Sequence, residues 1–254
     1  VVTISNDTTI CTGDSAQLVA SGGTGYTWSP TTGLSDPNIA NPMASPAANT
    51  TYTVVVSNGA ACLDSATVDV SLFTLPTVVA GPDTAICENE CVDLLATGAV
   101  TYVWAPTTGL SDPNIPNPQA CPTVTTEYIV TGTDGNSCTN TDTVDVVINA
   151  LPPVEAGADE TICNTDSVQL NATGAVNYVW TPAADLSDPN IADPFASPST
   201  TTQYFVTGTD ANGCVNIDSM FVNVNGLPVI AISNDTTICV GDTAQLNATG
   251  GTTY

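Results

Sequence analysis

Carboxylates, thiols and hydroxyls are the only side chains in this sequence with strong chemistry. The chain has 254 residues, with 25 Asp and Glu, nine Cys, and no Lys, Arg or His. It therefore has no imidazole base, no amine for a Schiff base, and no guanidinium to clamp phosphate or carboxylate. We predict a protein that is not an enzyme and has no catalytic residues.

The formal net charge of −25 also restricts the partners. Nucleic acid is excluded, because binding to phosphate backbones depends on cationic side chains. Anionic lipid surfaces would repel the chain, and no apolar run approaches the ~18 residues of a membrane span, so we expect no membrane insertion. The acidity can keep a long extracellular polymer soluble, or it can serve calcium binding.

The cysteines recur with a fixed spacing. Cys11, Cys87, Cys163 and Cys239 follow one another at 76 residues, and Cys62, Cys138 and Cys214 keep the same step. This regularity indicates an oxidising compartment. The period predicts one bridge per repeat, closing a loop of about 50 residues and contributing roughly 4 kcal/mol. The predicted pairs are Cys11–Cys62, Cys87–Cys138 and Cys163–Cys214.

Two further cysteines, Cys91 and Cys121, lie in the second repeat. We predict that they pair with each other. The alternative is a zinc site, since this repeat holds four cysteines, although their spacing does not match a zinc knuckle. Cys239 then has no partner within this chain. The serine pairs Ser15/Ser45 and Ser167/Ser197 occupy the positions of Cys91/Cys121, so each should have its Cα atoms within about 7 Å.

Other landmarks share the 76-residue period, among them Trp28, Trp104 and Trp180. The predicted domains are residues 1–76, 77–152 and 153–228, followed by an incomplete fourth repeat, 229–254. We expect the sequence to be a window on a longer fibre. In that case Ile238, Leu246 and Tyr254 would lie exposed, because the strands that cover them are missing.

Within the first repeat, short β-branched runs are bounded by turn residues, and no helical period is present. Residues 6–9 form a polar stretch between the first two expected strands, and the proline-rich segment 30–46 can supply only turns and an edge strand. The expected strands are 1–5, 15–21, 25–29, 51–57 and 67–72. This pattern predicts an all-β protein, a tandem array of Ig-like antiparallel β-sandwich repeats.

The recurring aromatic residues have two interpretations. Trp28, Trp104 and Trp180 at strand positions indicate core packing, with a sugar-stacking platform as the alternative. Tyr52, Tyr128 and Tyr204 resemble the tyrosine corner of Ig-like folds, in which the hydroxyl bonds a nearby backbone group.

Recurring aspartates also have two interpretations. Asp36, Asp112 and Asp188 precede Pro-Asn, which is typical of an Asx-type turn. Asp134 and Asp210 lie before glycine-containing turns. Calcium is the alternative for the first three, and no other cofactor is expected.

Several phrases recur in order along the whole chain: Thr-Ile-Cys-x-Gly-Asp-Ser/Thr-x-Gln-Leu, Tyr-x-Trp-x-Pro, Gly-Leu-Ser-Asp-Pro-Asn-Ile-Ala-Asn-Pro and Thr-Thr-x-Tyr-x-Val. With these, the chain resembles the PKD-like, Ig-like repeats of giant surface adhesins from Bacteroidota. The resemblance implies an extracellular cell-surface protein, exported by type IX secretion and associated with gliding motility or attachment.

The expected function is thus a non-catalytic, semi-rigid stalk or filament. Its expected partners are copies of itself or neighbouring repeats in a fibre, and a surface glycan or other cell-surface ligand. The alternative is a glycan-binding or calcium-dependent adhesion array in a larger secreted protein.

The resemblance also implies O-glycosylation, because these organisms modify Asp-Ser/Thr followed by a small or apolar residue. Chance occurrence in a Ser/Thr-rich chain is the alternative. The candidate hydroxyls are Thr8, Ser15, Ser65, Thr84, Thr143, Ser167, Ser219, Thr236 and Thr243.

Overall fold

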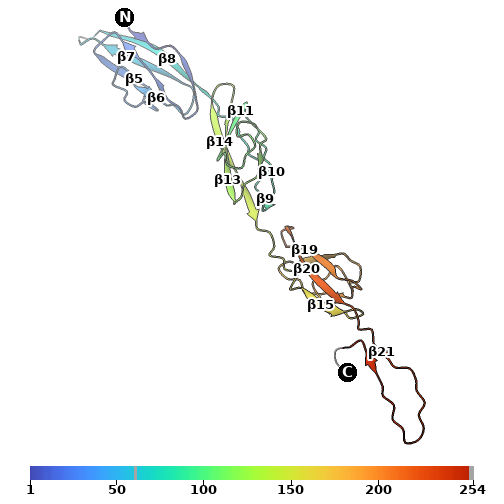
Figure 1. The fold of residues 1–254 in the computed structure, drawn as a ribbon. Coiled ribbons are helices and arrows are strands. Elements are labelled where there is room, and N and C mark those ends of the chain that lie inside the picture. Colours follow the sequence, from blue (N-terminus) through green and yellow to red (C-terminus); the bar gives the residue numbers. More distant parts are fainter. Residues whose placement is uncertain (60–61, 252–254) are drawn as a thin grey trace. The chain divides into compact units, whose positions relative to one another are not determined.

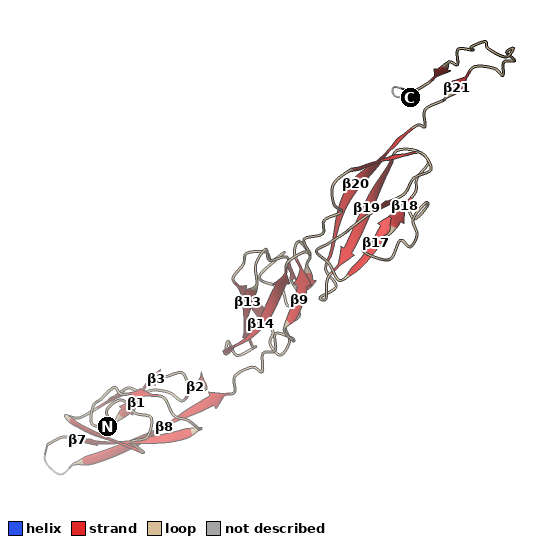
Figure 2. Ribbon diagram, turned by 90° about the horizontal axis from the view of Figure 1, so that it is seen from below, coloured by secondary structure: helices blue, strands red, loops and turns tan. Residues whose placement is uncertain are grey.

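The computed structural model describes residues 1–59 and 62–251. Within these ranges the chain consists of strands and loops, without a helix (Figures 1 and 2). A membrane-spanning helix is accordingly not found in this part of the chain. The all-β, Ig-like tandem fold predicted from the sequence is confirmed.

The strands follow the 76-residue period. Those of the first repeat are β1 (Thr3–Ile4), β2 (Thr8–Cys11), β3 (Ala16–Gln17), β4 (Ala20–Ser21), β5 (Gly25–Ser29), β6 (Met43–Ala44), β7 (Thr50–Ser57) and β8 (Leu63–Phe73). Those of the second are β9 (Thr84–Cys87), β10 (Val92–Asp93), β11 (Thr101–Ala105), β12 (Gln119–Ala120), β13 (Thr126–Thr133) and β14 (Thr139–Asn149). Those of the third are β15 (Glu160–Cys163), β16 (Val168–Gln169), β17 (Asn177–Thr181), β18 (Phe195–Ala196), β19 (Thr202–Thr209) and β20 (Val215–Asn225), with β21 (Ala231–Ile232) and β22 (Ala248–Thr249) beyond them.

Each repeat is organised around a four-stranded sheet. In the first repeat its order is β2-β8-β7-β5, and the second and third repeats have the equivalent orders β9-β14-β13-β11 and β15-β20-β19-β17. The short ladders β1–β4 and β3–β6 contribute Ala20 and Ala44 to the core, and Leu18 joins them from the link between β3 and β4. The same core contains Val54 and Val68 from the main sheet. These ladders therefore form the opposing layer of a sandwich.

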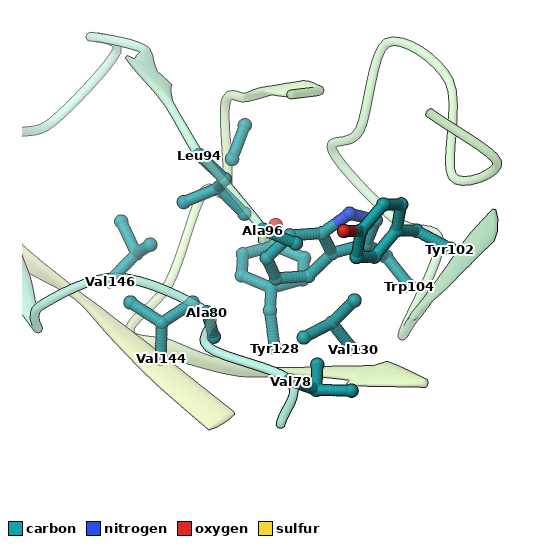
Figure 3. Packing of buried hydrophobic residues seen from close by; sticks show 11 residues of the cluster. Val78, Ala80, Leu94, Ala96, Tyr102, Trp104, Tyr128, Val130, Val144 and Val146 are labelled. Carbon is teal, nitrogen blue, oxygen red and sulfur yellow. The ribbon is translucent and has the colours of Figure 1, made fainter. Parts of the chain in front are cut away.

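The core of each repeat is built on alternate strand residues. In the second repeat Trp104 and Tyr128 are fully buried, with Val130, Val144 and Leu94 packed around them (Figure 3). The indole N–H of Trp104 donates to the carbonyl of Ile115 at 3.1 Å, so the one polar atom of the ring is satisfied. A ring buried in this way contributes apolar area without the penalty of an unpaired donor.

Strand β2 differs from the expectation that residues 6–9 form a polar connection. Residues Thr8–Cys11 pair in parallel with the end of β8, with Thr8 opposite Val70 and Cys11 opposite Phe73. A run of only four residues with two threonines has no clear alternation, so its pattern did not predict a strand. Pairing at the sheet edge satisfies the backbone groups that face β8, and it places Cys11 at the end of β8 where the chain leaves the repeat.

Candidate functional site: the cysteines at the ends of the repeats

The first repeat carries its two cysteines at opposite ends. Cys11 lies opposite Phe73, the last residue of β8, whereas Cys62 immediately precedes Leu63, the first residue of β8. An eleven-residue strand is roughly 33 Å long. A disulfide requires Cα atoms within about 7 Å of each other, so these two cysteines cannot bridge within the folded repeat. The predicted pair Cys11–Cys62 is wrong for this reason.

Cys11 instead forms a disulfide with Cys138 of the second repeat. Their Cα atoms are 5.5 Å apart although the two cysteines are 127 positions apart in the sequence. Cys138 immediately precedes β14, and at this same end the side-chain amide of Asn140 donates to the carbonyl of Pro76 at 3.0 Å. The bridge therefore lies at the end of the second repeat where the chain enters it. The first and second repeats are therefore joined twice, once by the peptide chain and once by a disulfide.

The environment of Cys138 holds this bridge in place. Cys138 is fully buried, and its backbone N–H donates to the carboxylate of Asp134 at 2.8 Å. The same carboxylate oxygen accepts the N–H of Asn136 at 2.8 Å. Asp134 therefore organises the turn that presents Cys138, which extends the turn role expected for it. Asp210 makes the equivalent bond to Cys214 at 2.8 Å.

The other two predicted pairs are also wrong, the third-repeat pair for the same geometric reason and the second-repeat pair because one of its cysteines is already bonded. Cys163 ends β15 opposite Asn225, the last residue of β20, whereas Cys214 precedes Val215, the first residue of that strand. Cys138 is already bonded to Cys11, which excludes the predicted Cys87–Cys138 pair. Six cysteines are in disulfides, namely Cys11, Cys87, Cys91, Cys121, Cys138 and Cys214.

The remaining thiols of the described chain, Cys62, Cys163 and Cys239, are free and exposed. Cys239, for which we predicted no partner within this chain, is one of these three. Cys62 and Cys163, by contrast, were both predicted to be bridged.

The extra bridge of the second repeat, Cys91–Cys121, is present as predicted, with a Cα–Cα distance of 4.3 Å. It continues the β10–β12 ladder, in which Val92 pairs with Ala120. Two cysteines consumed in this bridge are not available to a zinc ion, and a group of three or more potential metal ligands is not found in the part of the chain that the structure describes.

The predicted serine equivalents stand at the same position of the ladder. Ala16 pairs with Ala44 in the first repeat, and Val168 pairs with Ala196 in the third. The next residues outward in each register are Ser15 and Ser45, and Ser167 and Ser197. The register places each serine pair directly across the two strands, where neighbouring Cα atoms are about 4.5–5.5 Å apart.

The aromatic candidates lie in the cores. Trp28, Trp104 and Trp180 are at most 1% exposed, so none of them offers a ring face to a sugar. The hydroxyl of Tyr52 donates to the carbonyl of Thr32 at 2.9 Å, and that of Tyr128 to Thr108 at 2.9 Å. Tyr204 makes the equivalent contact with Ala184 at 3.5 Å. Burial raises the pKa of all three phenols, and for Tyr204 the nearby charge of Asp185 raises it further.

The aspartates considered as calcium ligands make local turn contacts. The Oδ1 atoms of Asp36, Asp112 and Asp188 accept the backbone N–H two residues ahead, at 2.8, 2.8 and 2.9 Å. These are Asx turns. Each of these carboxylates is therefore hydrogen-bonded to the backbone of its own loop.

Most of the hydroxyls considered for glycosylation are accessible. Thr8, Thr84 and Ser219 are half-buried, while Ser15, Ser65, Thr143, Ser167, Thr236 and Thr243 are exposed. In the second repeat the position of Ser15 is taken by Cys91, which is bridged.

In the segment after the third repeat, Ile238 and Leu246 are 50% and 78% exposed. Tyr254, predicted to be exposed with them, lies outside the described residues.

Comparison with known proteins gives similarity only at the level of structure. No protein-family model matches the chain, and no curated protein matches it. Titin domains I67–I69, in an E-to-A mutated variant, are 10% identical with a TM-score of 0.41, covering 88% of this chain and 98% of that one. Extracellular domains 3–5 of Drosophila OTK are 9% identical with a TM-score of 0.36, covering 87% and 94%.

The eight N-terminal Ig domains of the Down Syndrome Cell Adhesion Molecule are 12% identical with a TM-score of 0.37, covering 92% of this chain and 36% of that one. Similarity at this level does not assign a function to the chain.

Proposed function

We propose that this chain is a non-catalytic, structural or adhesive segment of an extracellular array, acting as a stalk or filament at the cell surface. The observation that carries the proposal is the Cys11–Cys138 bridge, which joins one repeat to the next. A disulfide between two repeats limits how far they can separate, which is useful in an extended array under load. Such a bond is stable in an oxidising compartment. The resemblance of the repeat phrases to those of Bacteroidota adhesins supports attachment or gliding as the setting.

The chemistry of the chain agrees with this role. Without His, Lys or Arg it has few groups able to act as a general base or an electrophilic clamp. Many of its carboxylates accept hydrogen bonds from the backbone of loops and strands, as Asp36, Asp134 and Asp159 do. The high negative charge keeps neighbouring filaments apart and in solution.

Surface labelling of the native organism tests the proposal. Antibodies against the repeats should decorate filaments on intact cells, and deleting two repeats from the gene should shorten those filaments in electron micrographs. Labelling that appears only after the cells are permeabilised would refute an extracellular role.

A further inference from the structure

The inter-repeat bridge changes which part of the chain is loaded when the array is pulled from its ends. Cys11 and Cys138 close a covalent ring that contains residues 12–137. This ring includes strands β3–β8 of the first repeat and β9–β13 of the second. Between Val1 and Ile148 the shortest covalent route therefore runs through residues 1–11, the disulfide and residues 138–148. Unfolding within the ring adds nothing to the length of this route.

The residues that remain on the route are already extended. On one side of the bridge the chain runs along β2, which ends at Cys11, and on the other it enters the eleven-residue strand β14 directly after Cys138. A strand rises about 3.3 Å per residue, close to the maximum that a polypeptide can reach. Tension along these strands therefore stretches them very little.

We propose that the Cys11–Cys138 bridge carries tension past the first repeat and most of the second, so that in the oxidised state the chain between Val1 and Ile148 is a nearly inextensible tether. This inference rests on the proposed function, since only an array under load uses the property. In the oxidised state, a repeat that unfolds transiently inside the ring leaves the distance between the ends unchanged and can refold without working against the load.

Reduction converts the tether into an extensible chain. One molecule of a dithiol such as dithiothreitol breaks the Cys11–Cys138 bond and forms its own internal disulfide, passing two electrons and two protons to the two cysteines. The chain between them, residues 12–137, then joins the load path. Fully extended, they add about 420–460 Å.

Single-molecule stretching of the full chain, held by its two ends, tests the proposal. The variant to pull keeps Cys11 and Cys138 and replaces the other seven cysteines with serine. Its final extension should be about 420–460 Å shorter without dithiothreitol than with it. Equal final extensions under the two conditions would overturn the proposal.

A matched control keeps Cys11 and Cys62 instead. These cysteines lie at opposite ends of β8, so we expect no bridge and the same extension with and without dithiothreitol. A redox-dependent extension in this control would overturn the proposal.

If circular dichroism shows that the serine variants do not fold, the proposal is tested on the wild-type chain instead. After digestion before aspartate, the peptides 7–13 and 134–141 should be linked by a disulfide, and dithiothreitol should lengthen the stretched chain by at least about 420 Å. Absence of the linked peptides, or a smaller lengthening, would overturn the proposal. Surface labelling reports separately on the proposed function, because it does not depend on how the cysteines pair.

Discussion

The carboxylate of Asp7 accepts a hydrogen bond of 2.9 Å from the backbone N–H of Asp69 and so ties the start of β2 to β8. The same bond joins Asp83 to Asp145 at 2.9 Å and Asp159 to Phe221 at 2.8 Å. Replacing Asp159 with Ala leaves the N–H of Phe221 without this acceptor. We expect the free energy of unfolding to fall by about 1 kcal/mol, measured by urea denaturation.

Asp159→Asn is the control for that substitution, because an amide oxygen can still accept the bond. It should lose less stability than Asp159→Ala. Equal losses in the two variants would mean that the hydrogen bond is not the cause.

The buried tyrosines predict a loss of stability at alkaline pH. Burial holds the pKa of Tyr52, Tyr128 and Tyr204 above the value of a free phenol. As pH rises above about 10, the unfolded chain releases these protons before the folded chain does, so the free energy of unfolding decreases. Below that pH all three phenols are protonated in both states and contribute no slope.

Denaturation of Tyr128→Phe as a function of pH checks this assignment. The variant should be less stable by about 1 kcal/mol near pH 7, because it loses the bond to Thr108. It should also show a shallower decline above pH 10. An unchanged alkaline slope would contradict the assignment to this residue.

The serine pairs offer sites for engineered bridges. Substituting cysteine for both Ser15 and Ser45, or for both Ser167 and Ser197, should give disulfides that span the same 30 residues as Cys91–Cys121. Each stabilises by about 3–4 kcal/mol in the chain-entropy model. Peptide mapping should show the new bridge, and the melting temperature should rise. The single variant Ser45→Cys is the control, and failure of the double variant to oxidise would show that the serines are not opposite each other.

The free thiols give a direct check on the cysteine pairing. Alkylation of the unreduced chain should label Cys62 and Cys163, which are free and exposed, and it should leave Cys11 and Cys138 unlabelled because they are bonded to each other. Trypsin has no site in a chain without Lys or Arg, so the map requires cleavage before aspartate. Label on Cys11 or Cys138 would contradict the bridge.

Glycosylation remains a prediction of the resemblance. Ser15, Ser167 and Thr243 share one register of the repeat, and all three are exposed. We expect glycan on at least one of them in native material, seen as added mass on the intact chain and on its peptides. Unmodified masses for the peptides that carry all nine candidate hydroxyls would contradict the prediction.

The sequence predicted the core better than it predicted the connections. Trp104 and Tyr128 stand on alternating strands whose pattern is strong, and they are buried where expected. The pairing Cys91–Cys121 was also predictable, because no other repeat supplied partners at those positions. In contrast, Cys11–Cys62 and Cys11–Cys138 obey the same 76-residue period, so the period could not distinguish a bridge within a repeat from one between repeats.

The missing information was the direction of one short strand. Residues Thr8–Cys11 pair in parallel with β8, and this alone sets Cys11 at the opposite end from Cys62. Parallel pairing of a four-residue edge strand depends on tertiary packing and on the carboxylate of Asp7, which a local pattern does not reveal.

The ring closed by Cys11 and Cys138 has a further consequence for a protein exposed to proteases. A single peptide bond cut anywhere between residues 12 and 137 opens the ring but leaves residues 1–11 covalently attached to residues 138–148. Severing that link requires loss of the disulfide, or a cut within the short strands on either side of it. An exposed loop between residues 12 and 137 can therefore be nicked without separating the two ends of this part of the chain.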